Sequence, residues 1–96
     1  MKTIKATPEF ESWEDSLKDR VAVGRIRVRI RRLSLGNAGN HRNLKGGVSE
    51  IRIDFGPGYR VYYTERDGEI VILLCGGTKK RQSKDIADAE RIAGRY

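Results

Sequence analysis

Residues 48–81 read VSEIRIDFGPGYRVYYTERDGEIVILLCGGTKKR, and this stretch predicts three extended segments joined by two tight turns. In the first segment Ile51 and Ile53 alternate with charged residues, which is typical of a strand with one buried and one charged face. A Gly-Pro-Gly sequence follows, and an Asp-Gly pair at 67–68 is a strong hairpin signal. We therefore expect an antiparallel three-stranded meander.

The second and third segments predict how the faces of this sheet are used. Strand alternation places Arg60 and Tyr62 on one face and Val61 and Tyr63 on the other. The third segment, residues 70–75, is apolar on both faces, which predicts a central strand covered on each side. We expect the Gly-Gly pair that follows to end this strand.

Two helices are predicted before the meander. A short edge strand in residues 1–6 comes first, and Thr7 is then positioned to cap a helix with an apolar stripe. Asp19 is positioned to cap a second helix that runs to about residue 35. Gly24 weakens that helix by up to about 1 kcal/mol, and we expect close packing against the first helix to compensate.

The outer side of the second helix carries unexplained apolar residues. Val21, Val28 and Leu35 fall on its far side and form a candidate docking strip for a partner. Packing beneath the first helix is the alternative interpretation. Residues 36–47, rich in Gly and Asn, are predicted to be a loop.

A third helix is predicted after the meander, with Thr78 as its cap. Lys79, Lys80 and Arg81 then occupy its first turn. Cations are unfavourable beside the positive end of a helix dipole, so this placement indicates that an anion compensates them. A basic helix start that is simply solvated is the alternative.

Composition bounds the class of protein. A chain of 96 residues that is 38% apolar can form one small core, so we expect a single domain over residues 1–96. Twenty Lys and Arg against 13 Asp and Glu give a net charge of +7, which favours contact with phosphate, an acidic protein or an anionic surface. Residues 20–49 contain eight basic residues and no acidic one.

Cysteine and histidine usage narrows the chemistry. Cys75 is the single cysteine, so no intramolecular disulfide can form and a reducing compartment is expected. His41 is the single histidine, which excludes a His-based metal cluster and leaves a general-base role open. No apolar run approaches the roughly 18 to 20 residues that cross a bilayer. We expect a cytoplasmic protein with no membrane contact, metal or cofactor.

Two sequence motifs in this order of elements resemble a known family. Gly-Pro-Gly-Tyr-Arg-Val-Tyr-Tyr at 56–63 and Leu-Leu-Cys-Gly-Gly-Thr-Lys at 73–79 are similar to the RelE/ParE superfamily of bacterial toxins, in particular its addiction module killer protein, or HigB-like, branch. The resemblance implies an α+β fold in the order β-α-α-β-β-β-α, with an antiparallel meander, two N-terminal helices and one C-terminal helix.

The resemblance also implies a function. RelE-like members are type II toxins that enter the ribosomal A site of the 70S ribosome and cut messenger RNA without a metal. A ribose 2′-hydroxyl attacks the adjacent phosphate and leaves a 2′,3′-cyclic phosphate. The implied partner is a cognate antitoxin, a helix-turn-helix repressor, and operator DNA is contacted only through the antitoxin complex.

The resemblance assigns site residues as well. Arg60 matches the arginine that these toxins place against the scissile phosphate, and a structural ion pair with Glu50 or Asp54 is its alternative role. Lys79 and Arg81 match the basic cluster after the last strand, and Glu50 is the candidate base. The tail offers only Tyr96 where several relatives carry an acid or base, so a crowded lysine or Tyr62 is the candidate for proton transfer. The candidate RNA contacts are Lys45, Arg52, Tyr62, Lys80 and Gln82.

Two other function classes remain open from the sequence. A ParE-like inhibitor of DNA gyrase shares the fold and acts by binding protein, so replacing Arg60 has little effect in that case. A basic RNA-binding module without catalysis loses affinity by small increments when residues on the sheet are changed. Exposed phenols then stack on bases.

Overall fold

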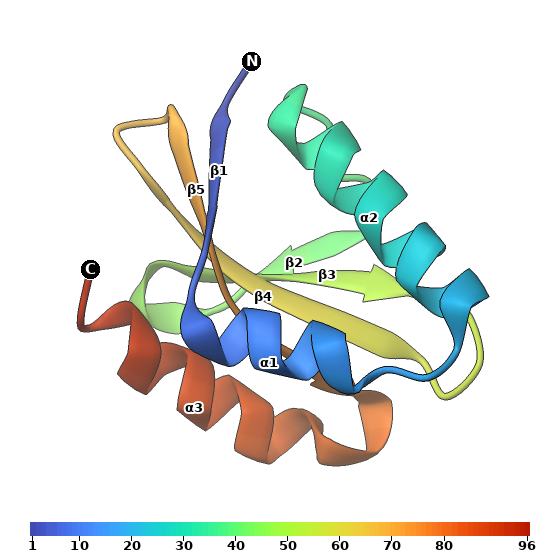
Figure 1. Cartoon of the computed structure of the whole chain (residues 1–96). Helices are drawn as coiled ribbons and strands as arrows, with labels where there is room; N and C mark the ends of the chain where they lie inside the picture. The colour runs from blue at the N-terminus through green and yellow to red at the C-terminus, as the bar shows by residue number, and fades with distance from the viewer.

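The computed structural model describes residues 1–96 and has the expected order of elements with one additional strand (Figure 1). The strands and helices are β1 (Thr3–Ala6), α1 (Pro8–Ser16), α2 (Arg20–Ser34), β2 (His41–Asn43), β3 (Val48–Ile53), β4 (Tyr59–Arg66), β5 (Ile70–Thr78) and α3 (Gln82–Ala93). Two short 3₁₀ turns, η1 (Lys45–Gly47) and η2 (Lys79–Arg81), precede β3 and α3. The predicted α+β fold is confirmed.

The strands form one five-stranded sheet in the order β1-β5-β4-β3-β2. β1 pairs with β5 in parallel, and every other pairing is antiparallel. The meander predicted over residues 48–81 is therefore present, with its last strand inside the sheet between β1 and β4. No helix of the chain is long and apolar enough to span a membrane.

Each face of the sheet carries its own hydrophobic core. Phe10 of α1 and Ile26 of α2 pack with Ile51 and Val61 on one face, whereas α3 covers the other face, where Ile92 packs with the strands. The alternation in β3 predicted one buried and one charged face. The second face does carry Glu50 and Arg52, but α3 lies over it (Figure 1) and Glu50 is completely buried.

Local signals placed the starts of α1 and α2 and the second turn correctly. The Thr7 hydroxyl accepts a hydrogen bond from the Phe10 amide at 3.0 Å, and an Asp19 carboxylate oxygen accepts one from the Val21 amide at 3.0 Å. Asp67 and Gly68 both have positive φ, 58° and 67°, as a type I′ hairpin turn requires. These predictions are confirmed.

The segment 36–47 was predicted as a loop, but it contains β2, which pairs with β3 from His41 opposite Ile51. The Arg29 guanidinium donates hydrogen bonds to the carbonyls of Ala38 and Asn40 at 3.1 and 3.0 Å. These bonds hold the Gly- and Asn-rich chain close enough to the sheet to add an edge strand.

The Gly-Gly pair does not end the last strand, because β5 continues to Thr78. A Cβ at Gly76 would lie 2.3 Å from the Trp13 ring, and a Cβ at Gly77 would lie 1.8 Å from the nearer carboxylate oxygen of Asp85. The two glycines therefore allow close approach of α1 and α3 to opposite faces of the strand. A bulge at Leu74 adds one residue to β5, and this determines which face of the sheet Gly76 and Gly77 each lie on.

The start of α3 also differs from the prediction. The Thr78 side chain caps nothing; Lys79, Lys80 and Arg81 form the 3₁₀ turn η2, and the helix begins at Gln82. The Lys79 amide donates to the Gly58 carbonyl at 2.8 Å. This bond ties the turn to the loop between β3 and β4, which offsets the missing side-chain cap.

Gly24 does not pack against the first helix, contrary to the prediction. A Cβ built at this position meets nothing within 4 Å, so its helix-weakening effect has no compensation inside the chain. Val21, Val28 and Leu35 remain exposed on the same helix, with 59, 48 and 59% of their surface accessible. The alternative that they pack beneath α1 is excluded.

Candidate functional site

Arg60 is the central residue of the candidate site because it is a buried cation without a counterion. It lies in β4 with 5% of its surface exposed, on the face of the sheet that α3 covers. Its side chain makes no ion pair, and its Nε is buried without a hydrogen-bond partner. Burying an unpaired charge is costly, so the site favours an anion that approaches Arg60.

The cross-strand neighbours of Arg60 add to its charge. Arg52 of β3 is directly opposite on one side and Gly77 of β5 on the other. Like charges directly opposite each other destabilise a sheet. The ion pair with Glu50 or Asp54 that the sequence left open does not form, because Glu50 lies opposite Tyr62 and pairs with other residues.

Glu50 is fully buried, which the sequence did not predict for any carboxylate. Its Oε1 lies 3.2 Å from Nε of Arg52 and 3.5 Å from Nη2 of Arg42, and its Oε2 accepts from Nε2 of Gln82 at 2.9 Å. Both oxygens are therefore occupied. Glu50 therefore holds Arg42, Arg52 and Gln82, the first residue of α3, at the end of the sheet where Arg60 lies.

The basic turn η2 stands beside this cluster. Lys79, Lys80 and Arg81 are exposed and make no ion pair within the chain. Thr78, just before the turn, pairs with Tyr59, the residue preceding Arg60. The structure thus brings the predicted cations of the last helix start to the same end of the sheet as Arg60.

Tyr62 belongs to the core under α3 and has no exposed surface. Burial raises the pKa of its phenol, and the carboxylates of Glu50 and Asp85 raise it further. Its hydroxyl lacks a hydrogen-bond partner. The ring packs in the core and offers no face on which a base can stack.

Three other candidate residues lie away from the cluster. Lys45 lies in η1, just before β3 begins at Val48, whereas Arg52 lies near the other end of that strand, about 13 Å from Val48. His41 pairs with Ile51, and its Nδ1 lies 2.8 Å from the Gly39 carbonyl. The Tyr96 carbonyl accepts from Arg66 beyond the C-terminal end of α3.

Residues 8–96 match the family described as Phage derived protein Gp49-like (DUF891). The chain belongs to this family. The Gp49-like family is part of the RelE/ParE-type group of addiction module toxins. The family identity agrees with the fold, in which a central antiparallel meander lies between two N-terminal helices and one C-terminal helix.

A protein from Haemophilus influenzae strain Rd, described as an uncharacterized protein, is similar to this Gp49-like chain. It is 48% identical over 90 residues, which cover 94% of this chain and 91% of the relative. Its similarity extends over nearly the whole fold. It therefore includes the strands and the basic turn that build the Arg60 cluster.

Asp85 is a residue of this Gp49-like protein that sequence reasoning missed. It lies in the first turn of α3, 7% exposed, and its Oδ2 is buried without a partner beside Gly77. Burial raises the pKa of its carboxyl, and the nearby charge of Arg81 opposes this shift. The signal that could have found it is the Gly-Gly pair, because a glycine in a central strand marks close approach of another group.

The cluster has the chemistry of a phosphate site. A buried guanidinium, a second guanidinium held by Glu50 and a turn of three cations can surround a dianionic phosphate with charge-assisted hydrogen bonds. No group of three or more His, Cys, Asp or Glu residues is arranged to hold a metal ion. Cys75 is buried under α3, and burial raises the pKa of its thiol to about 12, which excludes a thiolate nucleophile at neutral pH.

Proposed function

We propose that this Gp49-like protein is the toxin of a type II toxin–antitoxin module of the HigB-like branch. In this proposal it cleaves messenger RNA in the A site of the ribosome, in the cytoplasm, with no metal or cofactor. The observation that carries the proposal is Arg60, a buried cation with no partner inside the chain. An anionic transition state is what such a group stabilises best, because the charge is already in place and desolvated.

The proposed reaction is transesterification within the RNA. The 2′-hydroxyl loses its proton as its oxygen bonds to the adjacent phosphorus, and the 5′ oxygen takes up a proton as its bond to phosphorus breaks. The products are a 2′,3′-cyclic phosphate and a free 5′-hydroxyl. Negative charge grows on the two non-bridging oxygens during this step, so fixed cations beside them lower the barrier.

The proposed roles of the neighbouring residues follow from their surroundings. Arg60 contacts the scissile phosphate, and Lys79 and Arg81, exposed in η2, contact its other oxygen and the next phosphate. Glu50 acts as a positioning residue, because both of its oxygens hold donors. Arg52, Lys80 and Gln82 border the RNA path.

Lys45 and Tyr62 have weaker support as RNA contacts. Lys45 is exposed but reaches only RNA that extends beyond the cluster along β3. Tyr62 is buried, and its raised pKa makes it a poor proton acceptor at neutral pH. Removal of these two side chains therefore affects cleavage less than removal of Arg60.

The test maps messenger RNA 5′ ends after brief induction of the wild type and of Arg60→Ala in cells without the antitoxin. Discrete cuts in translated codons are expected for the wild type. They should fall by about 10²- to 10³-fold in the variant, the range for loss of one charge-stabilising group. Arg31→Ala, which removes an exposed arginine outside the cluster, serves as the matched control and should leave the cuts unchanged.

Other outcomes point to other functions. Growth arrest without cuts contradicts the nuclease and directs the search to a gyrase complex, as for ParE-like proteins. RNA binding without arrest or cuts indicates a binding module. Cuts that persist in Arg60→Ala would contradict the assignment of the site.

A cognate antitoxin is the proposed partner, with operator DNA contacted only through the complex. The family membership supports this partner, since Gp49-like proteins are part of an addiction module toxin group. The net charge of +7 makes an acidic partner segment electrostatically favourable.

A further inference from the structure

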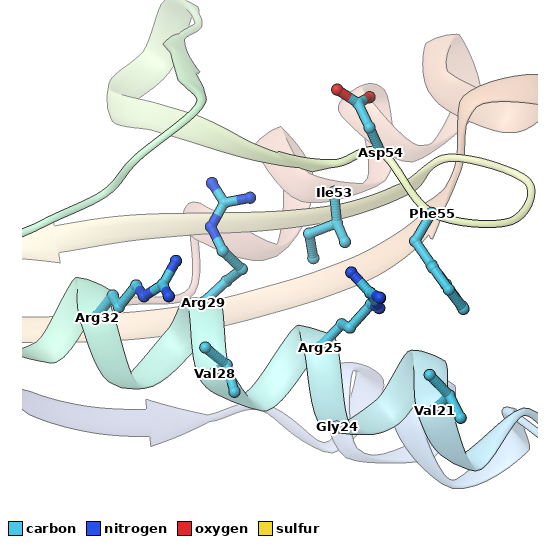
Figure 2. Close-up of a pocket in the computed structure, with 9 residues that line it drawn as sticks. All are labelled: Val21, Gly24, Arg25, Val28, Arg29, Arg32, Ile53, Asp54 and Phe55. Atoms are coloured by element: carbon cyan, nitrogen blue, oxygen red, sulfur yellow. The ribbon is translucent and has the colours of Figure 1, made fainter.

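A groove separates α2 from the end of β3, on the opposite face of the sheet from Arg60. Its volume is about 500 Å³, and Figure 2 shows α2 forming one wall with Ile53, Asp54 and Phe55 across from it. The helix side presents residues from Val21 to Arg32 along one stripe. The groove is open, elongated along the helix and lined by both apolar and cationic side chains.

Gly24 makes this groove deep enough to hold another side chain. It lies on the helix stripe between Val21 and Val28 (Figure 2), and no atom comes within 4 Å of a Cβ built there. Glycine in a helix interior reduces stability relative to alanine. Because no packing inside the chain accounts for it, Gly24 is best explained by a group from outside that occupies the space.

The arginines of the groove are held in different ways. Arg25 stacks over the Phe55 ring, 4.5 Å from its centroid. Arg29 donates to the Arg52 carbonyl at 2.7 Å and closes the groove against the sheet. The Arg32 side chain makes no ion pair or hydrogen bond and is exposed. With Asp54 as the single acidic residue of the lining, three arginines leave the groove positively charged.

We propose that this groove binds an acidic amphipathic helix of the antitoxin. Apolar side chains one and two turns apart on that helix would pack against the α2 wall at Val21, Gly24 and Val28. Acidic residues beside them would pair with Arg25 and Arg32, which lie seven residues, about 10 Å, apart on α2. That the helix belongs to the antitoxin rests on the proposed toxin function. That it is acidic and amphipathic is inferred from the residues that line the groove.

The apolar side chains of the groove favour a protein ligand over RNA. Val21 and Val28 are about half exposed, with 59 and 48% of their surface accessible, and burying them against a polypeptide is favourable. Phosphates gain nothing from contact with these side chains. RNA phosphates would contact only the charged groups of Arg25 and Arg32. A protein helix would also pack against Val21, Val28 and the space at Gly24.

The test measures the dissociation constant between this protein and the helix-turn-helix protein encoded by the adjacent gene, at a fixed salt concentration. Gly24→Leu fills the groove with a good helix former, so the variant stays folded, and its dissociation constant should rise at least about 30-fold. Arg32→Glu should raise it about 10-fold or more. Arg31→Glu, its exposed neighbour outside the lining, is the matched control and should change it by less than about 3-fold.

Melting curves of every variant show that the fold is retained, and toxicity is scored separately. Gly24→Leu should still cleave messenger RNA but no longer be neutralised by co-expressed antitoxin. The proposed binding site is wrong if both Gly24→Leu and Arg32→Glu bind the adjacent protein as tightly as the wild type does. It is also wrong if Arg31→Glu weakens binding as much as Arg32→Glu does, or if the wild type forms no complex.

The proposed toxin function and the proposed binding site are tested by different measurements, RNA cleavage for the first and dissociation constants for the second. If the wild type cuts no RNA, the dissociation constants still decide the groove, because they require no cleavage. If a single-stranded 20-nucleotide RNA binds the wild type and loses affinity in Arg32→Glu, while the adjacent protein binds both alike, an RNA occupant replaces the proposed helix.

Discussion

The cluster around Arg60 and the groove along α2 are both rich in arginine, but the chain treats the arginines of the two regions differently. Arg60 is buried with no partner, opposite another cation. In the groove, Arg29 donates to three backbone carbonyls and Arg25 stacks on an aromatic ring. One region keeps a charge unsatisfied; the other uses charge to hold the fold together.

This difference separates the two kinds of contact the protein is proposed to make. A buried, unsatisfied cation weakens the folded state and gains most when an anion arrives, which suits a transition state. In the groove, Arg25 and Arg29 are held by the fold and Arg32 is free, and these arginines lie beside the apolar side chains of α2, which suits a protein partner. Net charge alone does not distinguish them.

The strongest test of this comparison replaces an arginine in each region by methionine. Arg29→Met removes three charge-assisted hydrogen bonds and should lower the free energy of unfolding by about 3 kcal/mol. Arg60→Met removes none and should keep or raise it. Urea titration at pH 7 measures both. Equal destabilisation by the two changes would contradict the comparison.

Glycine-to-alanine substitutions test the same contrast at the backbone. At Gly77, the added methyl would lie 1.8 Å from a carboxylate oxygen of Asp85, so that side chain must move within a covered site. We expect a loss of about 2 kcal/mol in stability from this overpacking. Thermal unfolding measures it, and a loss below measurement error would mean that α3 shifts freely over the strand.

Gly24→Ala should have a smaller effect of opposite sign. The new methyl meets open space, and alanine is the better helix former, so stability should rise by about 0.5 to 1 kcal/mol. The same urea titration detects this gain. A decrease in stability would show that Gly24 serves a packing role inside the folded chain.

The smallest expected effect concerns the pH dependence near Asp85. Because the folded carboxyl has a raised pKa, the folded state binds its proton more readily, and stability falls as the pH rises through that raised value. Asp85→Asn removes this loss, so its melting temperature should exceed that of the wild type at pH 7. The difference in melting temperature between Asp85→Asn and the wild type should disappear below about pH 4. A difference that stays the same from about pH 4 to pH 7 would contradict a raised pKa for Asp85.

Local sequence signals predicted the elements well because each depends on neighbouring residues. Thr7 and Asp19 cap the helices as predicted, and Asp67 with Gly68 forms the hairpin turn. The α-α-β-β-β-α order followed from these signals together with the two periodicities. The exception is β2, which was predicted as a loop because its pairing depends on hydrogen bonds from Arg29 of another element.

The surroundings of the candidate site were not predictable in the same way. The alternation around Glu50 and Arg52 is also typical of an open charged face, and only the position of α3 makes Glu50 buried. Asp85 in a polar helix looks like a solvated residue. Its burial depends on Gly77, eight positions earlier and in another element.

The parallel pairing of β1 with β5 has a consequence for the order of events during synthesis. Thr3 pairs with Ile70, so the first strand of the chain has no partner until the last strand has been made. β5, an inner strand that lies between β1 and β4, is also the last of the five strands to be synthesised. Contacts this distant in sequence slow folding. The Arg60 cluster, which includes η2 after β5, therefore cannot be completed until the chain has been synthesised through β5 and η2.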